Sequence, residues 1–124
     1  MTKILVVEDE AVIREAYTLL LEAHQYAVDS AANGHEALEL CDKNTYDVIL
    51  LDLMMPGLDG VGFLEKANLK KTSPQTRVII MSNLSSGHEV IQAKKLGANR
   101  HEVKSDLAPS EVIAVVDTEL SMVG

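Results

Sequence analysis

Short, uninterrupted apolar runs rich in β-branched residues alternate along this chain with longer amphipathic segments. The clearest runs cover residues 4–7, 48–51 and 78–81, and weaker ones cover residues 26–31 and 101–104. A run of this length between polar neighbours is typical of a strand that is buried on both faces, as in a parallel sheet. The pattern therefore predicts five short strands.

The segments between the runs repeat their apolar residues at helical spacing. The first predicted helix covers residues 10–24, and its apolar face carries Ile13, Tyr17, Leu20, Leu21 and His24. Further stripes predict helices over residues 36–42, 61–69 and 89–96, with a polar loop over residues 70–74. A last helix is predicted near the C-terminus from the stripe Val112, Val115, Val116 and Leu120.

Strand and helix thus alternate five times. This order predicts an α/β fold in which a five-stranded parallel sheet carries helices on both faces, with right-handed crossovers between strands. The chain has 124 residues, so we expect a single domain over residues 1–124. Hydrophobic residues make up 47% and aromatic residues only 3%, which predicts an aliphatic core.

The charge balance narrows the range of partners. A net charge of -8 and a sequence pI near 4.8 argue against direct contact with nucleic acid or with an anionic membrane surface. The single cysteine, Cys41, excludes an internal disulfide. No apolar run approaches the ~20 residues that span a bilayer, and no signal peptide is recognisable at the N-terminus. We therefore expect a cytoplasmic location.

Polar side chains that can carry chemistry follow the predicted strands. Glu8 and Asp9 follow the first, Asp52 the third, Ser82 the fourth and Lys104 the fifth. In an open α/β sheet the functional site lies beyond the carboxyl ends of the strands, so these side chains are predicted to converge. Each has an ordinary alternative: a helix cap for Asp9, and a turn for Asp52. Ser82 and Lys104 could be a loop hydroxyl and a surface charge.

The three carboxylates would repel one another, and a divalent cation would relieve that repulsion. Since only oxygen ligands are present, Mg²⁺ is favoured over Zn²⁺, with Mn²⁺ as the alternative. Asp52 could then act as a nucleophile that forms an acyl phosphate. The cation, the Lys104 ammonium and the Ser82 hydroxyl would bind the oxygens of the transferring phosphoryl group.

The chain resembles the response regulator receiver domains of two-component signalling along nearly its whole length. The resemblance is carried, in order, by ILVVEDE (residues 4–10), NGHEAL (33–38), DVILLDLMMPGLDG (47–60), VIIMS (78–82) and KKLGAN (94–99). The third segment is the most specific. The resemblance implies the flavodoxin-like strand order 2-1-3-4-5.

The resemblance also implies a function and its residues. Asp52 would accept a phosphoryl group from a phosphohistidine on a sensor histidine kinase or a phosphotransfer protein. Asp9 and Asp52 would bind Mg²⁺ directly, with Glu8 acting through water and the backbone carbonyl of Met54 as a further ligand. The domain would promote its own phosphorylation and dephosphorylation without being an enzyme that turns over a substrate.

The resemblance places Ser82 at the switch-hydroxyl position and Lys104 at the phosphate-pairing position. His101 stands where the family usually has Tyr or Phe, and it is either a working switch or a partly exposed surface histidine. Ser105 stands where the family usually has Pro after the lysine. Because a cis bond before serine costs about 2.5–4 kcal/mol, we predict a trans 104–105 peptide and a rearranged loop.

The sequence also differs from the usual family pattern beside the phosphate site and on a surface that many family members use to dimerise. Asn83 replaces a smaller residue beside the phosphate, so the dephosphorylation rate is predicted to differ. Asn99 and Arg100 replace an acidic pair that helps to build the dimer face of many DNA-binding members, which argues against that dimer mode here. The output domain or target protein is not readable from the sequence.

Two other functions compete with the phosphoacceptor hypothesis. A Mg²⁺-dependent phosphatase with an aspartate nucleophile usually has a second Asp two residues later, but Met54 holds that position. A degenerate receiver would bind its partners without phosphate, and the intact set of polar residues at the strand ends argues against it.

Overall fold

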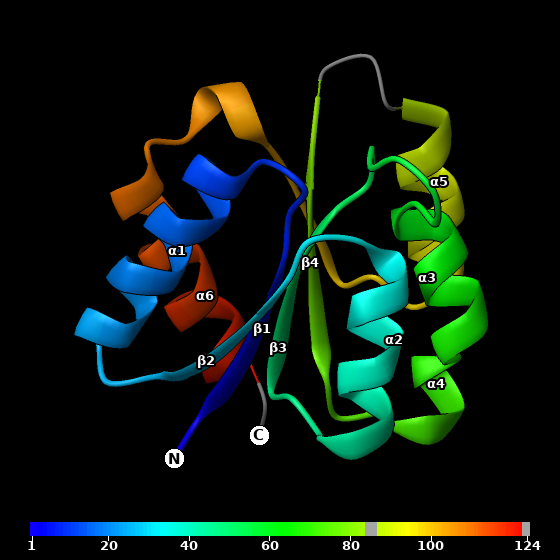
Figure 1. The fold of residues 1–124 in the computed structure, drawn as a ribbon, viewed down its shortest axis with the longest axis horizontal. Helices are drawn as coiled ribbons and strands as arrows, with labels where there is room; N and C mark the ends of the chain where they lie inside the picture. The colour runs from blue at the N-terminus through cyan, green and yellow to red at the C-terminus, as the bar shows by residue number, and fades with distance from the viewer. Residues whose placement is uncertain (84–86, 123–124) are drawn as a thin grey trace.

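The computed structural model describes residues 1–83 and 87–122. Strands and helices alternate along the chain, as Figure 1 shows. Their bounds are β1 (Lys3–Val7), α1 (Ala11–Ala23), β2 (Ala27–Ala31), α2 (Gly34–Lys43), β3 (Val48–Asp52), α3 (Gly60–Ala67), α4 (Leu69–Thr72), β4 (Arg77–Ser82), α5 (Gly87–Lys95), β5 (Arg100–Val103), a 3-10 turn (Lys104–Asp106) and α6 (Pro109–Ser121).

The five strands form one parallel sheet in the order β2-β1-β3-β4-β5. Helices α1 and α6 cover one face of the sheet, and α2, α3, α4 and α5 cover the other (Figure 1). The predicted fold class and strand order are therefore confirmed. None of the described helices is long and apolar enough to cross a membrane.

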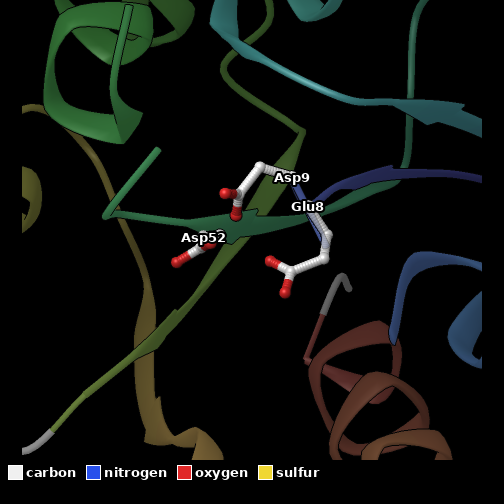
Figure 2. Close-up of side chains that lie close together, drawn as sticks. All are labelled: Glu8, Asp9 and Asp52. Atoms are coloured by element: carbon white, nitrogen blue, oxygen red, sulfur yellow. The ribbon is translucent and has the colours of Figure 1, made fainter. Parts of the chain in front are cut away.

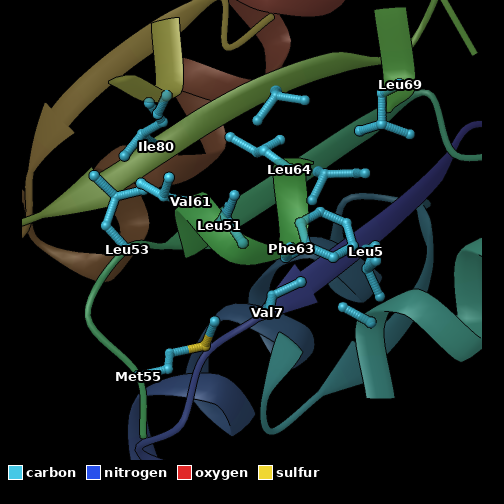
Figure 3. Close-up of a cluster of buried hydrophobic side chains, with 14 of the residues drawn as sticks. Leu5, Val7, Leu51, Leu53, Met55, Val61, Phe63, Leu64, Leu69 and Ile80 are labelled. Atoms are coloured by element: carbon cyan, nitrogen blue, oxygen red, sulfur yellow. The ribbon is translucent and has the colours of Figure 1, made fainter. Parts of the chain in front are cut away.

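Two mainly aliphatic clusters, one on each face of the sheet, form the core. Leu5 and Val7 of β1 point to the face where Phe63 and Leu64 of α3 pack, as Figure 3 shows. Alternate residues such as Ile4 point to the opposite face, toward α1 and α6. Because both faces are covered, the inner positions of the central strands are all apolar, and this produces the continuous runs seen in the sequence.

The prediction of a polar loop over residues 70–74 is wrong for residues 70–72. Lys70 and Thr72 lie in the short helix α4, and the predicted helix over residues 61–69 ends early, at Ala67. Asn68 separates the two helices with a φ of 49°, a left-handed conformation that asparagine tolerates better than most residues. Its carbonyl accepts the Thr72 N–H at 3.0 Å, which closes the extra turn.

The structure also tests the predictions for two segments that follow strands, the start of α1 and the chain after Lys104. Helix α1 begins after Glu10 without a side-chain cap, so the capping alternative for Asp9 is not realised. Across the described residues every peptide bond is trans, which confirms the prediction for the bond between Lys104 and Ser105. The chain after Lys104 continues as a 3-10 turn, in which Lys104 O accepts the Leu107 N–H at 3.3 Å.

Candidate functional site

Strand register brings three carboxylates together at the carboxyl edge of the sheet. Val7 of β1 pairs with Leu51 of β3, so Glu8 and Asp9 emerge beside Asp52, the last residue of β3. One oxygen from each of these three side chains lies within 4.8 Å of the others. In Figure 2 the three carboxylates extend into the same region. We call Glu8, Asp9 and Asp52 the carboxylate cluster.

Lys104 supplies the cation that contacts this cluster. Its Nζ lies 2.7 Å and 2.9 Å from the two carboxylate oxygens of Glu8, and 3.2 Å from Oδ2 of Asp52. The Lys104 side chain is only 18% exposed, so it is not a solvated surface charge. Its position follows from the pairing of Ser82 with Val103, which places Lys104 just beyond the end of β4.

The carboxylate cluster carries more negative charge than one ammonium balances. Burial and the neighbouring Asp52 raise the pKa of Glu8 to about 8, against the opposing effect of Lys104. Burial also raises the pKa of Asp52. Burial by itself lowers the pKa of Lys104, but its bond to Glu8 and the charge of Asp52 raise that pKa overall. A second cation would stabilise all three carboxylates in their charged form.

The cluster borders an open pocket of about 330 Å³, whose lining includes Asp9, Asp52, Met54, Asn83 and Lys104. The pocket thus offers both carboxylates and an ammonium. Hard oxygen donors of this kind suit Mg²⁺ or Mn²⁺, which keep several water ligands when bound by one or two carboxylates. The Met54 N–H donates to Oδ1 of Asp52 at 3.2 Å, while the predicted role of the Met54 carbonyl stays a prediction.

Ser82 and His101 are joined by a hydrogen bond next to the site. Ser82 is the last residue of β4 and is fully buried, so it is not an ordinary loop serine. Its Oγ lies 2.6 Å from Nε2 of His101 on the neighbouring strand β5. His101 is half-buried. The two residues predicted to form a switch are therefore in direct contact.

The sequence predictions do not include the contacts of two charged residues, Arg14 and Glu119. Arg14, in the first turn of α1, donates to the backbone carbonyl of Glu8 at 2.8 Å. Glu119 of α6 is 3% exposed and binds Arg77 at 2.8 Å. Helical spacing could have found Glu119, because it lies on the same face of the predicted helix as Val112, Val115 and Val116. The contact of Arg14 with a loop carbonyl had no comparable signal.

The comparison with known families identifies the class of protein. The response regulator receiver domain family matches residues 4–117, and the chain belongs to that family. It is therefore a receiver domain of the response regulators that operate in two-component systems.

Among curated proteins, the transcriptional regulatory protein ResD of Bacillus subtilis is 40% identical over 112 residues, which cover 90% of this chain and 45% of ResD. The response regulator ArlR of Staphylococcus saprophyticus is 38% identical over 104 residues, covering 84% of this chain and 46% of ArlR. The chain thus spans less than half the length of these relatives.

Solved structures of the same fold include receiver domains and chemotaxis proteins. Chemotaxis protein CheY4 of Vibrio cholerae superposes with a TM-score of 0.85 at 28% identity, covering 95% of this chain and 98% of CheY4. The response regulator TrrA of Thermotoga maritima, solved in complex with Mg²⁺ and BeF, has a TM-score of 0.80 at 30% identity. That match covers 96% of this chain and 99% of TrrA.

Proposed function

We propose that this receiver domain is a phosphoacceptor switch in which Asp52 takes a phosphoryl group from a phosphohistidine. The observation that carries the proposal is the position of Asp52. Its side chain is 6% exposed, borders the open pocket and lies 3.2 Å from Lys104 Nζ. The donor would be a sensor histidine kinase or a phosphotransfer protein, and the domain would complete one transfer for each signal rather than turn over as an enzyme.

In the proposed transfer, an oxygen of the Asp52 carboxylate attacks phosphorus and forms a P–O bond. The P–N bond of the phosphohistidine breaks, and its electron pair leaves on the imidazole, which takes up a proton. Lys104 is placed to bind an oxygen of the transferring group, because its ammonium already contacts Asp52. Lys104 thus stabilises the negative charge on the group during transfer.

The same site is proposed to hold Mg²⁺, with Mn²⁺ as an alternative. Asp9 and Asp52 would be direct ligands and Glu8 would act through water, while the Met54 carbonyl would complete the protein ligands. The cation would supply positive charge to the phosphoryl oxygens. The three clustered carboxylates and the raised pKa of Glu8 support this proposal. The complex of TrrA with Mg²⁺ and BeF supports it by analogy.

Phosphorylation is proposed to act on the hydrogen bond between Ser82 and His101. A phosphoryl group on Asp52 would be a strong acceptor for the Ser82 hydroxyl proton and would draw that hydroxyl away from His101. Once Ser82 turns to the phosphoryl oxygen, the contact of 2.6 Å breaks and His101 is released. Because His101 lies on the edge strand β5, its release would change the surface that α5 and β5 present to a partner.

The competing functions are weaker. Met54 provides no carboxylic acid two residues after Asp52, so a phosphatase mechanism would lack its acid and base. A phosphate-independent module would not need a buried carboxylate cluster, because such a cluster costs folding stability when no cation is bound. The proposal includes a cytoplasmic location and an output domain or target protein that responds to phosphorylation.

The test is incubation with acetyl phosphate and Mg²⁺, followed by intact-mass measurement. Wild type is expected to gain one phosphoryl group, and Asp52→Asn is expected to gain none. Asp42→Asn, at an exposed aspartate of α2, is the matched control and should be phosphorylated like wild type. No adduct on wild type, or an undiminished adduct on Asp52→Asn, would contradict the proposal.

A further inference from the structure

Arg14 is half-buried and lies in the first turn of α1. A cation is unfavourable at this end of a helix, because the helix dipole places partial positive charge there. The side chain extends back toward the preceding loop, as long side chains on helices do. Its Nη1 donates to the carbonyl of Glu8 at 2.8 Å and to that of Asp9 at 3.4 Å. Two charge-assisted hydrogen bonds thus compensate for an unfavourable position.

The two carbonyls belong to the residues that supply two of the three clustered carboxylates. On the other side of the same segment, the Glu8 N–H donates to the carbonyl of Ala31 in β2 at 3.1 Å. The backbone at Glu8 is therefore held from both sides, by a strand through its N–H and by Arg14 through its C=O. The segment at Asp9 has no side-chain cap from α1 to fix it.

We propose that Arg14 is a positioning residue for divalent-cation binding. It fixes the backbone of Glu8 and Asp9 so that their carboxylates meet Asp52 before a cation arrives. The proposal rests on the proposed function, because it takes the carboxylate cluster to be the Mg²⁺ site. Among the described residues, the hydrogen bonds of Arg14 go only to backbone carbonyls, so Arg14 does not occupy the carboxylate oxygens that the cation or Lys104 would bind.

The direction in which the Mg²⁺ affinity changes when Arg14 is removed distinguishes a positioning role from a purely electrostatic one. Arg14 carries a positive charge close to a cation site, so removing that charge should tighten Mg²⁺ binding if charge is all that matters. If Arg14 positions the ligands, removing it should weaken binding, because the loop then pays the entropy of ordering when the cation binds. A purely structural role would lower stability and leave the cation affinity unchanged.

The experiment compares wild type with Arg14→Gln, Arg14→Lys and Glu15→Gln. Mn²⁺ affinity is measured by water-proton relaxation and Mg²⁺ affinity by competition, at one fixed pH. Arg14→Gln is expected to weaken binding about tenfold, at the lower end of the effects seen for residues that orient metal ligands. Arg14→Lys should recover part of the loss, because an ammonium can still reach one carbonyl. Glu15→Gln alters an exposed neighbouring charge and should bind Mn²⁺ like wild type.

A metal-free readout makes the test independent of any activity. Amide hydrogen exchange without divalent cations should be faster at residues 8–12 in Arg14→Gln than in wild type, with unchanged protection in β3. Equal or tighter Mn²⁺ binding by Arg14→Gln overturns the proposal and leaves the proposed function standing. If wild type binds no Mn²⁺ at all, the proposed function fails and the positioning role fails with it. If Arg14→Gln does not fold, Arg14→Lys decides: weaker Mn²⁺ binding than wild type with faster exchange at residues 8–12 supports positioning, because an ammonium keeps the charge but reaches only one carbonyl. Affinity equal to or tighter than that of wild type overturns the proposal.

Discussion

Two groups of buried charges lie at opposite edges of the same sheet, and they differ in how their charge is balanced. At the carboxyl edge, three carboxylates share the Lys104 ammonium. At the amino edge, Arg77 and Arg100 face Glu119 of α6, and Arg100 also binds Glu102. We call these four residues the guanidinium cluster. It has two cations for two carboxylates, whereas the carboxylate cluster has one cation for three carboxylates.

The difference indicates which group is structural and which is functional. A buried carboxylate is tolerated when a cation and hydrogen bonds satisfy it, as Arg77 does for Glu119 through Nε at 3.0 Å and Nη2 at 2.8 Å. Glu8 is equally buried but has to share its cation with Asp52, and its pKa is raised to about 8. An uncompensated charge at a pocket edge is a common sign of a binding site.

The largest expected effect is stabilisation by Mg²⁺. At a concentration of about one hundred times its dissociation constant, Mg²⁺ should add about 2.7 kcal/mol to the free energy of unfolding. Denaturant titration with and without Mg²⁺ measures the gain. Asp9→Asn should lose most of it, whereas Glu119→Gln should keep it. Loss of the gain in both variants would break the distinction between the clusters.

Glu119→Gln should lower the free energy of unfolding by about 2 kcal/mol, because Arg77 keeps its charge without a carboxylate partner. The value lies below the range for fully buried ion pairs since the Arg77 side chain is 26% exposed. Thermal and urea unfolding at neutral pH measure the change. An unchanged stability would show that the guanidinium cluster is not a structural ion pair.

Glu8→Gln should change stability in the opposite direction to Glu119→Gln. It should raise the free energy of unfolding by about 1 kcal/mol at pH 8 without divalent cations. The pKa of Glu8 is raised from 4.5 to about 8, so between these values the folded protein binds a proton that the unfolded chain has released. The contribution of Glu8 to stability therefore falls as the pH rises from 6 to 8.

The pH dependence can be isolated by difference. Unfolding of wild type and Glu8→Gln is followed at several pH values between 6 and 8 in the presence of a chelator. The gain from the substitution should be smallest at pH 6 and largest at pH 8. A gain that is constant across this range would show that Glu8 does not titrate in it.

The smallest expected effect concerns Arg100. Its Nη1 lies 3.9 Å from Glu119, and its side chain is 30% exposed. Arg100→Gln should therefore change the free energy of unfolding by less than about 0.5 kcal/mol, as is usual for partly exposed ion pairs. Urea unfolding beside Glu119→Gln tests this. A loss as large as that of Glu119→Gln would show that both guanidinium groups are required.

Much of the fold could be predicted from the sequence because the strands are buried on both faces. The runs at residues 48–51 and 78–81 mark β3 and β4 closely. Strand β3 is one residue longer than its run, at the C-terminal end, and β4 is one residue longer at each end. The sequence pattern predicts a loop in place of most of α4, because three of its four residues, Lys70 to Thr72, are polar. Its helical conformation depends on the left-handed backbone of Asn68, which the sequence pattern does not reveal.

The sequence by itself determined the parallel α/β sheet and the polar residues that follow each strand, because hydrophobic periodicity and strand order are local properties of the chain. Only the tertiary structure decided how these residues share charge. Strand register places Lys104 between Glu8 and Asp52. The Arg14 side chain extends from α1 to the preceding loop and donates to its backbone carbonyl at Glu8. Burial then sets the pKa of Glu8, since the cost of a charge depends on the atoms that surround it and not on its neighbours in sequence.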